Sequence, residues 1–158
     1  MTYLKTLKNK KALVTGHTGF EGSWLSAWLH LLGVDVYGIS LEYSPSCPSH
    51  FDVTELSEIV EDQRVDIRNS NELTECVNYI KPEFVFHLAT QALVRESYND
   101  PVVTYHTNVL GTLNLLEGLR SLEKPCTAVL ITSDKCYDNV EWVWGYRESD
   151  TLGGPDPY

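Results

Sequence analysis

The sequence predicts an α/β fold in which helices cover a doubly wound parallel sheet of about five strands. Short β-rich runs alternate with segments whose apolar residues recur at helical spacing, an order typical of parallel sheets with right-handed crossovers. The fourth and fifth of these runs are continuously apolar, as strands buried on both faces are. A glycine-rich turn separates the first run from the first helical segment. The 158 residues are about one domain in length.

The predicted elements follow one another with turn residues between them. The helix over 101–122 has the clearest periodicity, and Asp100 followed by Pro101 marks its start as a capping residue and a first-turn proline. The segment 41–53, rich in serine and proline, is predicted to be a loop, and the chain from Asp138 onward a long irregular stretch. The predicted strands cover 12–15, 35–40, 64–66, 84–88 and 127–132, and the predicted helices cover 19–32, 71–80 and 101–122.

The glycine-rich turn has the spacing of a phosphate-binding loop. The first glycine allows a tight turn, the second lets the backbone approach a pyrophosphate, and the third lets the helix pack on the strand. The helix N-terminus adds free N–H groups and a positive dipole end. The turn therefore predicts a Rossmann-like dinucleotide site, although a tight turn that merely needs small residues is the alternative. The predicted cofactor-binding residues here are Gly16, His17, Thr18, Gly19, Phe20, Glu21 and Gly22.

Composition and charge argue against several classes of function. The net charge of −10 disfavours nucleic acid and anionic membrane surfaces as partners, because neither attracts an acidic protein. No apolar run approaches the roughly 18 residues of a membrane span, and no signal peptide is predicted. Cys47 and His50 have ligand-like spacing but no second pair, so no metal site is predicted. Reduced, scattered cysteines fit a cytoplasmic protein.

Polar residues follow the predicted strands at their carboxyl ends, where doubly wound sheets bind ligands. After the second strand, Ser40-Leu41-Glu42 contains no arginine for a 2′-phosphate, which favours NAD over NADP, and the usual ribose-binding acid is absent or displaced to Glu42. Asp66, after the third strand, is placed to accept a hydrogen bond from the adenine amino group, with a helix cap as the alternative. The other cofactor contacts predicted at these ends are Ile67, Leu88, Ala89 and Thr90.

A hydroxyl, a carboxylate and an amine follow the fifth predicted strand as Ser133, Asp134 and Lys135. An acid–base pair is one interpretation, and a polar turn is the other. A lysine must be neutral to act as a base, and a neighbouring carboxylate raises its pKa. Burial or a nearby cation would have to overcome that effect.

Several of these motifs resemble the extended short-chain dehydrogenase/reductase superfamily: the glycine loop, the end of the fourth strand, and Asn108 within 107–112. The resemblance runs from about Lys10 to Tyr158. The Asp-Lys pair is its discriminating detail, because TDP-glucose 4,6-dehydratases usually carry Asp-Glu there and sugar epimerases carry neither group. The segments similar to the CDP-glucose 4,6-dehydratases in particular are 16–20, 93–98, 133–137 and 153–158.

The resemblance implies NAD-dependent conversion of CDP-glucose to CDP-4-keto-6-deoxyglucose, with Asn108 among the cofactor-binding residues. It implies that Tyr158, as a phenolate, removes the proton of the sugar 4-hydroxyl, and that Ser133 hydrogen-bonds this tyrosine. NAD takes a hydride from carbon 4 and returns it to carbon 6. Lys135 accepts the carbon-5 proton or helps another group to do so, and Asp134 protonates the departing 6-hydroxyl.

This sequence departs from the family pattern at two places. Glu21 stands where relatives commonly have lysine, and a carboxylate there repels phosphate unless it turns away. The sequence stops at Tyr158, before the motif lysine that lowers the tyrosine pKa from about 10, and before the substrate domain. We therefore expect residues 1–158 to form an NAD-binding Rossmann-type domain that is truncated at the catalytic tyrosine and inactive by itself.

In this superfamily the helix over 101–122 meets a second subunit, so we expect homo-oligomers with Val109, Leu113 and Leu116 partly exposed in one chain. Two other interpretations stay open. One is a dehydratase or epimerase whose sugar nucleotide carries another nucleobase. The other is a non-catalytic NAD-binding module. Trp142 and Trp144 are expected to pack within their loop, with a sugar site as the alternative.

Overall fold

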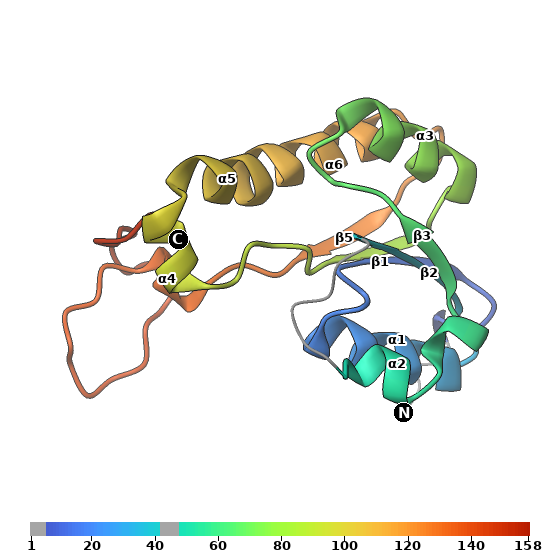
Figure 1. Cartoon of the computed structure of the whole chain (residues 1–158), viewed down its shortest axis with the longest axis horizontal. Helices are drawn as coiled ribbons and strands as arrows, with labels where there is room; N and C mark the ends of the chain where they lie inside the picture. The colour runs from blue at the N-terminus through green and yellow to red at the C-terminus, as the bar shows by residue number, and fades with distance from the viewer. Residues whose placement is uncertain (1–5, 42–47) are drawn as a thin grey trace.

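A computed structural model describes residues 6–41 and 48–158 and shows a five-stranded parallel sheet between two layers of helices (Figure 1). The strand order is β3-β2-β1-β4-β5, and every neighbouring pair is parallel. The chain thus reverses its direction of travel across the sheet after β3, which confirms the predicted doubly wound fold. The strands are β1 (Lys11–Thr15), β2 (Asp35–Ser40), β3 (Glu61–Arg64), β4 (Phe84–His87) and β5 (Thr127–Leu130).

Helices cover both faces of the sheet (Figure 1). One layer holds α1 (Phe20–Leu31), α2 (His50–Val53) and the 3₁₀ turn η2 (Leu56–Glu58). The other holds α3 (Ser70–Ile80) and a long helix made of α5 (Pro101–Tyr105), the π-helical η3 (His106–Leu110) and α6 (Gly111–Arg120). None of the described helices is long and apolar enough to span a membrane. The short helix α4 (Val94–Asn99) and the 3₁₀ turn η4 (Asp134–Cys136) lie near the C-terminus.

The core has two parts, one on each face of the sheet. Alternate residues of a strand point to opposite faces, so Leu13 of β1 joins one part while Ala12 and Val14 join the other. The first part fills the space under α3 and α6 with Ile39, Leu73, Val77, Ile80, Val85 and Leu115. The second lies under α1 and contains Leu29, Val34, Val36 and Val60.

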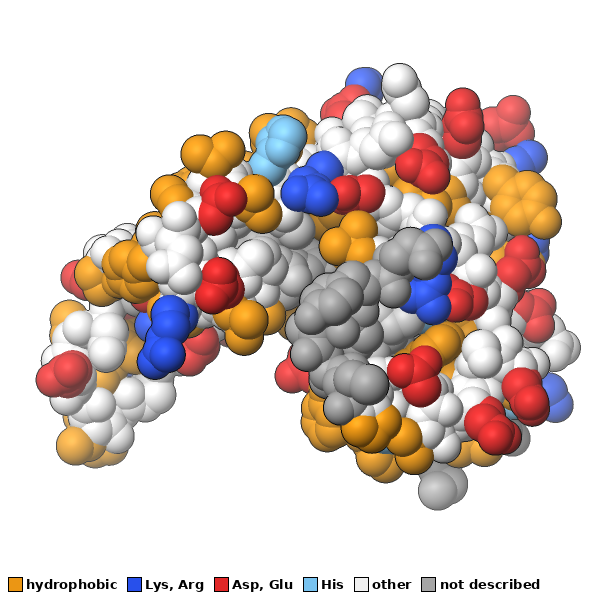
Figure 2. Space-filling view, in the orientation of Figure 1, with side chains coloured by type: hydrophobic (Ala, Val, Ile, Leu, Met, Phe, Trp, Pro, Cys, Tyr) orange, Lys and Arg blue, Asp and Glu red, His pale blue; other side chains and the backbone are white. Residues whose placement is uncertain are grey.

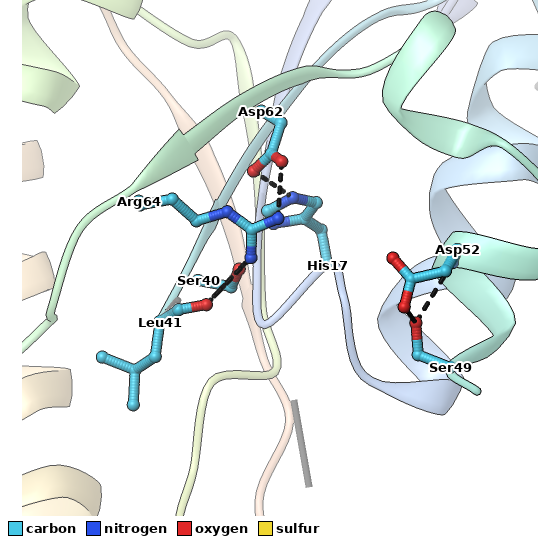
Figure 3. Close-up of polar contacts among 7 residues, drawn as sticks. All are labelled: His17, Ser40, Leu41, Ser49, Asp52, Asp62 and Arg64. Carbon is cyan, nitrogen blue, oxygen red and sulfur yellow. Dashed lines mark hydrogen bonds and ion pairs between the residues drawn. The ribbon is translucent and has the colours of Figure 1, made fainter. Parts of the chain in front are cut away.

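Two local predictions were wrong, and one short helix was missed. The third strand covers Glu61–Arg64 instead of 64–66, because it is a polar edge strand without the apolar alternation that predicts strands. The predicted loop 41–53 contains α2, which Ser49 caps by accepting a hydrogen bond from Asp52 N at 3.1 Å (Figure 3). The six-residue helix α4 was not predicted, since it is too short for periodicity to emerge.

The fifth strand is also less buried than its apolar sequence predicts. β5 forms an edge of the sheet, where β4 is its partner. Val129 on β5 and Ile131 just after it are exposed, because no described strand lies beyond them. By contrast, Val85 on β4 is fully buried.

A buried histidine ties the tips of β1 and β4 to α6. Nδ1 of His87 is 2.7 Å from Thr15 Oγ1, and Nε2 is 3.0 Å from Thr112 Oγ1. The Thr15 hydroxyl oxygen also accepts from the N–H groups of Leu88 and Ala89. Burial lowers the pKa of His87 to about 4, because a charged imidazolium loses its hydration there. The folded chain therefore holds His87 neutral.

We predict that acidification destabilises the fold through His87. The unfolded chain takes up this proton near pH 6.5 and the folded chain only near pH 4. The neutral His87 side chain therefore makes its full contribution to stability above pH 6.5. As the pH falls to 4, the free energy of unfolding decreases by about 3 kcal/mol through this group. Urea unfolding between pH 7 and 4 should give a shallower pH dependence for His87→Gln than for the wild type. The control, His30→Gln, removes an exposed histidine of α1. Equal slopes for His87→Gln and wild type would contradict the prediction.

Candidate functional site

The glycine loop between β1 and α1 is a tight turn that lies against the tip of β4. Gly16 has a φ of +74°, and its N–H donates to the Ile39 carbonyl at 2.7 Å. A Cβ on Gly16 would lie 2.9 Å from the backbone nitrogen of Ala89 and 3.0 Å from the carbonyl carbon of Leu88. Glycine is therefore required both for the backbone conformation and for the close approach of two strand tips.

Gly22 allows the first turn of α1 to lie directly against this loop. A Cβ on Gly22 would overlap the carbonyl oxygen of Gly16. Gly19 is the N-cap residue and has no side chain to accept from the first-turn N–H groups. These donors and the positive end of the helix dipole are consequently directed at the loop without a capping side chain. This arrangement suits an anionic group such as a pyrophosphate.

The side chains of the loop lie in different surroundings. His17 and Thr18 are buried, whereas Phe20 and Glu21 are exposed. Glu21 belongs to the first turn of α1, where the positive end of the helix dipole stabilises a carboxylate. The fold can therefore accommodate an acidic side chain at this position. His17 offers a phosphate its backbone N–H only, because its ring is fully buried.

The ring of His17 points from the loop toward β2 and β3 (Figure 3). It lies against the backbone of Gly38, where any Cβ would overlap it. Burial lowers the pKa of His17, so we assign a neutral ring that donates its Nε2–H to Asp62 Oδ1 at 2.9 Å. Nδ1 of His17 is buried and has no hydrogen-bond partner among the described residues.

An arginine that sequence reasoning missed lies across the end of β2. Arg64 belongs to β3, and the strand register places it beside Ser40. Its Nη1 donates to Ser40 Oγ at 3.0 Å and to the Leu41 carbonyl at 2.9 Å, while Nη2 donates to Asp62 Oδ2 at 2.7 Å (Figure 3). No arginine follows β2 directly in the sequence, as expected, but Arg64 reaches the same end of β2 from β3. Glu42 and Cys47 lie outside the described residues.

Asp66 follows β3 and is paired with an arginine. Its carboxylate accepts from Arg68 Nε and Nη2 at 2.9 and 2.6 Å, and these hydrogen bonds lower the pKa of Asp66. The helix-cap alternative for Asp66 is wrong, because Asn69 caps α3 by accepting from Glu72 N. Ile67 is buried in the core, and its carbonyl accepts from an asparagine of α6, so a cofactor can meet only its backbone edge.

Asn108 lies in the π-helical turn η3 and holds the segment that follows β4. Its Oδ1 accepts from Thr90 Oγ1 and from Gln91 N, both at 2.8 Å, and its Nδ2 donates to the Gln91 carbonyl at 3.2 Å. Leu88 and Ala89 lie against Gly16 of the glycine loop, and Asn108 holds Thr90, the next residue of the same segment. Asn108 fixes the shape of that segment through its amide.

The Ser133–Lys135 segment lies beyond β5, where it forms the start of η4. Ser133 Oγ accepts from Lys135 N at 3.0 Å and donates to Asp134 Oδ1 at 3.4 Å. These local bonds give the segment the polar-turn character of the alternative interpretation, while the functional groups of Asp134 and Lys135 stay exposed. No hydrogen bond joins Ser133 to Tyr158 in the described part of the chain.

Asp156 connects Lys135 to the end of the chain and was not predicted as a site residue. Only 5% of its side chain is exposed. Its Oδ2 accepts from Lys135 Nζ at 3.0 Å, and its Oδ1 accepts from Tyr158 N at 3.1 Å. This ion pair raises the pKa of Lys135, which holds the amine as an ammonium. The sequence signal for Asp156 was its place two residues before the tyrosine.

The irregular stretch after Asp138 projects from the sheet as a long loop closed at its base (Figure 1). Asp138 N donates to the Thr151 carbonyl at 2.9 Å, and the rings of Tyr137 and Tyr146 stack at 5.4 Å. The expectation that the tryptophans pack within this loop is wrong for Trp144, which is 71% exposed. A cavity of about 290 Å³ is lined by Trp142, Trp144, Gly145, Arg147 and Asp150.

A comparison with protein families identifies this arrangement. The model of the GDP-mannose 4,6 dehydratase family matches residues 13–158. The chain belongs to this family. It is 50% identical over 151 residues to CDP-glucose 4,6-dehydratase of Salmonella typhimurium, which covers 96% of this chain and 42% of that relative. The resemblance to the extended short-chain dehydrogenases/reductases is thereby confirmed.

Solved structures agree on the fold. An epimerase from Methanothermobacter thermautotrophicus matches all of this chain and 46% of its own, with a TM-score of 0.83 and 25% identity. The UDP-glucose 4-epimerase of Brucella ovis, solved in complex with NAD, covers 94% of this chain and 43% of its own, with a TM-score of 0.80 and 25% identity. The chain spans less than half the length of these relatives.

We predict that Gly22→Ala destabilises the fold although it replaces glycine within a helix. The new Cβ overlaps the Gly16 carbonyl, and such overpacking costs about 1–3 kcal/mol. The control is Gly118→Ala in α6, where the nearest atoms are 3.6 Å away and the change should stabilise by up to about 1 kcal/mol. Urea unfolding of both variants measures the free energy of unfolding, which should fall for Gly22→Ala and rise for Gly118→Ala. Stabilisation by Gly22→Ala would contradict the contact between helix and loop.

Proposed function

We propose that the chain is the NAD-binding portion of a CDP-glucose 4,6-dehydratase. The observation that carries the proposal is the pairing of two sites on a chain 50% identical to such an enzyme. One is the uncapped glycine loop after β1, and the other is the Ser133–Lys135 cluster with Asp156 and Tyr158 after β5. Both follow the carboxyl ends of parallel strands, where such sheets bind ligands.

The glycine loop suits the pyrophosphate of NAD. Gly16 and Gly22 exclude side chains from the turn, and the first-turn N–H groups of α1 supply the donors. Asp66 retains carboxylate lone pairs for an adenine amino group while Arg68 fixes its orientation. Asn108 positions the Thr90 segment on the other side of the loop. When bound, NAD supplies the hydride acceptor and donor of the reaction.

Tyr158 and Ser133 are proposed to act at the sugar 4-hydroxyl, with the phenolate accepting its proton. Asp134 is proposed to protonate the departing 6-hydroxyl. The buried Asp156 carboxylate keeps Lys135 charged. A charged lysine cannot accept the carbon-5 proton itself, so the role that remains is to help another group to accept it. As an ammonium, Lys135 helps another group to remove the carbon-5 proton by stabilising the negative charge that develops on the 4-keto sugar.

The enzyme is proposed to act in the cytoplasm as a homo-oligomer. Val109, Leu113 and Leu116 are between 41% and 55% exposed along the long helix, as the sequence predicted. Figure 2 shows hydrophobic side chains on the outer side of the α5 end of this helix. An exposed apolar helix face of this kind favours association with a second copy.

We predict that the isolated chain binds NAD and that Gly19→Asp weakens this binding about tenfold or more. The new carboxylate caps α1 by accepting its first N–H groups, so it stabilises the helix while it repels the pyrophosphate. Gly19→Asn is the matched control, since it caps without charge. Titration calorimetry and thermal unfolding separate affinity from stability.

Turnover is measured in the same preparations. We expect no conversion of CDP-glucose by the chain alone, read from the alkaline ultraviolet absorbance of a 4-keto sugar. Conversion would contradict the expected inactivity, and the absence of NAD binding at millimolar concentration would overturn the proposed cofactor site. Tighter competition by UDP-glucose or TDP-glucose than by CDP-glucose in the full-length enzyme would favour the other nucleotide-sugar enzymes.

We predict that Leu113→Glu shifts the chain toward a monomer. Leu113 is half-exposed on the helix face proposed to meet a second copy, and a buried unpaired carboxylate opposes association. Val143→Glu is the control, because Val143 is exposed in the loop after Asp138. Light scattering measures the mass of each. A monomeric wild type would contradict association through this helix.

A further inference from the structure

A chain of polar contacts links the glycine loop to the end of β2. It begins at the buried ring of His17, continues through Asp62, and ends at Arg64 (Figure 3). Asp62 uses a different carboxylate oxygen for each partner. Because the His17 ring is clamped against Gly38, it holds the carboxylate in one orientation, which makes His17 a positioning residue.

The guanidinium of Arg64 lies at the carboxyl end of β2, which is where doubly wound folds bind the adenosine ribose of a dinucleotide. Its bonds to Ser40 Oγ and the Leu41 carbonyl hold it at the carboxyl end of β2, and 32% of its side chain is exposed. An arginine at this end accommodates the 2′-phosphate of NADP, whereas an acidic residue binds the 2′-hydroxyl of NAD. This site contains both kinds of group, since the Asp62 carboxylate lies 2.7 Å from Nη2 of Arg64.

We propose that Asp62 sets the preference for NAD over NADP by engaging Arg64. The carboxylate offsets the charge of the guanidinium, so a 2′-phosphate meets a neutral pair and is repelled by the nearby carboxylate. The acid that sequence reasoning expected after β2 is thus supplied from β3, through the register that pairs Gly38 with Asp62. This inference rests on the proposed binding of NAD.

The test compares the affinities of NAD and NADP in each of four proteins by titration calorimetry. We expect the wild type to favour NAD, and Asp62→Asn to raise the affinity for NADP relative to NAD about fivefold or more. Adding Arg64→Gln to Asp62→Asn should remove that gain. The control is Glu117→Gln, which breaks a carboxylate–arginine pair on the exposed face of α6.

The ratio of the two affinities is independent of the fraction of folded protein, so partial unfolding of Asp62→Asn does not obscure the result. An unchanged ratio in Asp62→Asn, with NAD still bound, overturns this inference alone. A gain that persists in the double variant also overturns it, because Arg64 would not be its source. Failure of the wild type to bind either dinucleotide overturns the proposed function together with this inference.

Discussion

Gly22 lies so close to the carbonyl of Gly16 that no side chain fits between them, and the geometry of the whole loop follows from this contact. It lets α1 begin directly at the loop, so that its N–H groups face the turn without a capping side chain. The same loop touches the β4 tip at Ala89, which brings the segment held by Asn108 beside it. Neither approach tolerates a Cβ. The loop geometry that is proposed to bind phosphate is therefore a consequence of close packing among three elements.

The register of the parallel sheet accounts for the charges around this loop. It places Arg64 beside Ser40 and Asp62 beside Gly38, so an ion pair forms at the end of β2. At the other side of the sheet, Asp156 returns to pair with Lys135. In both places a carboxylate holds a cation in position. One pair bears on cofactor choice and the other on the protonation of the lysine.

Patterns in the sequence predict the parts of this structure that depend on local chemistry. Three glycines at fixed spacing predicted the loop, and Asp100 before Pro101 predicted the start of the long helix, where Asp100 accepts from Val103 N. Pairings that depend on strand register were missed, such as Arg64 reaching the end of β2 from another strand. The polar strand β3 was misplaced because an edge strand needs no apolar face. Exposure of β5 depends on its neighbours, which its own residues do not reveal.

The most direct measurement is an amide NMR titration of the ¹⁵N-labelled chain with NAD. If the loop and the helix start bind the pyrophosphate, the amide signals of residues 16–22 shift the most, because their N–H groups gain charged acceptors. Smaller shifts are expected near Asp66 and Thr90, which are proposed to contact other parts of the cofactor. If the largest shifts fell in the aromatic loop 142–150 and residues 16–22 did not shift, binding of the pyrophosphate by the glycine loop would be contradicted.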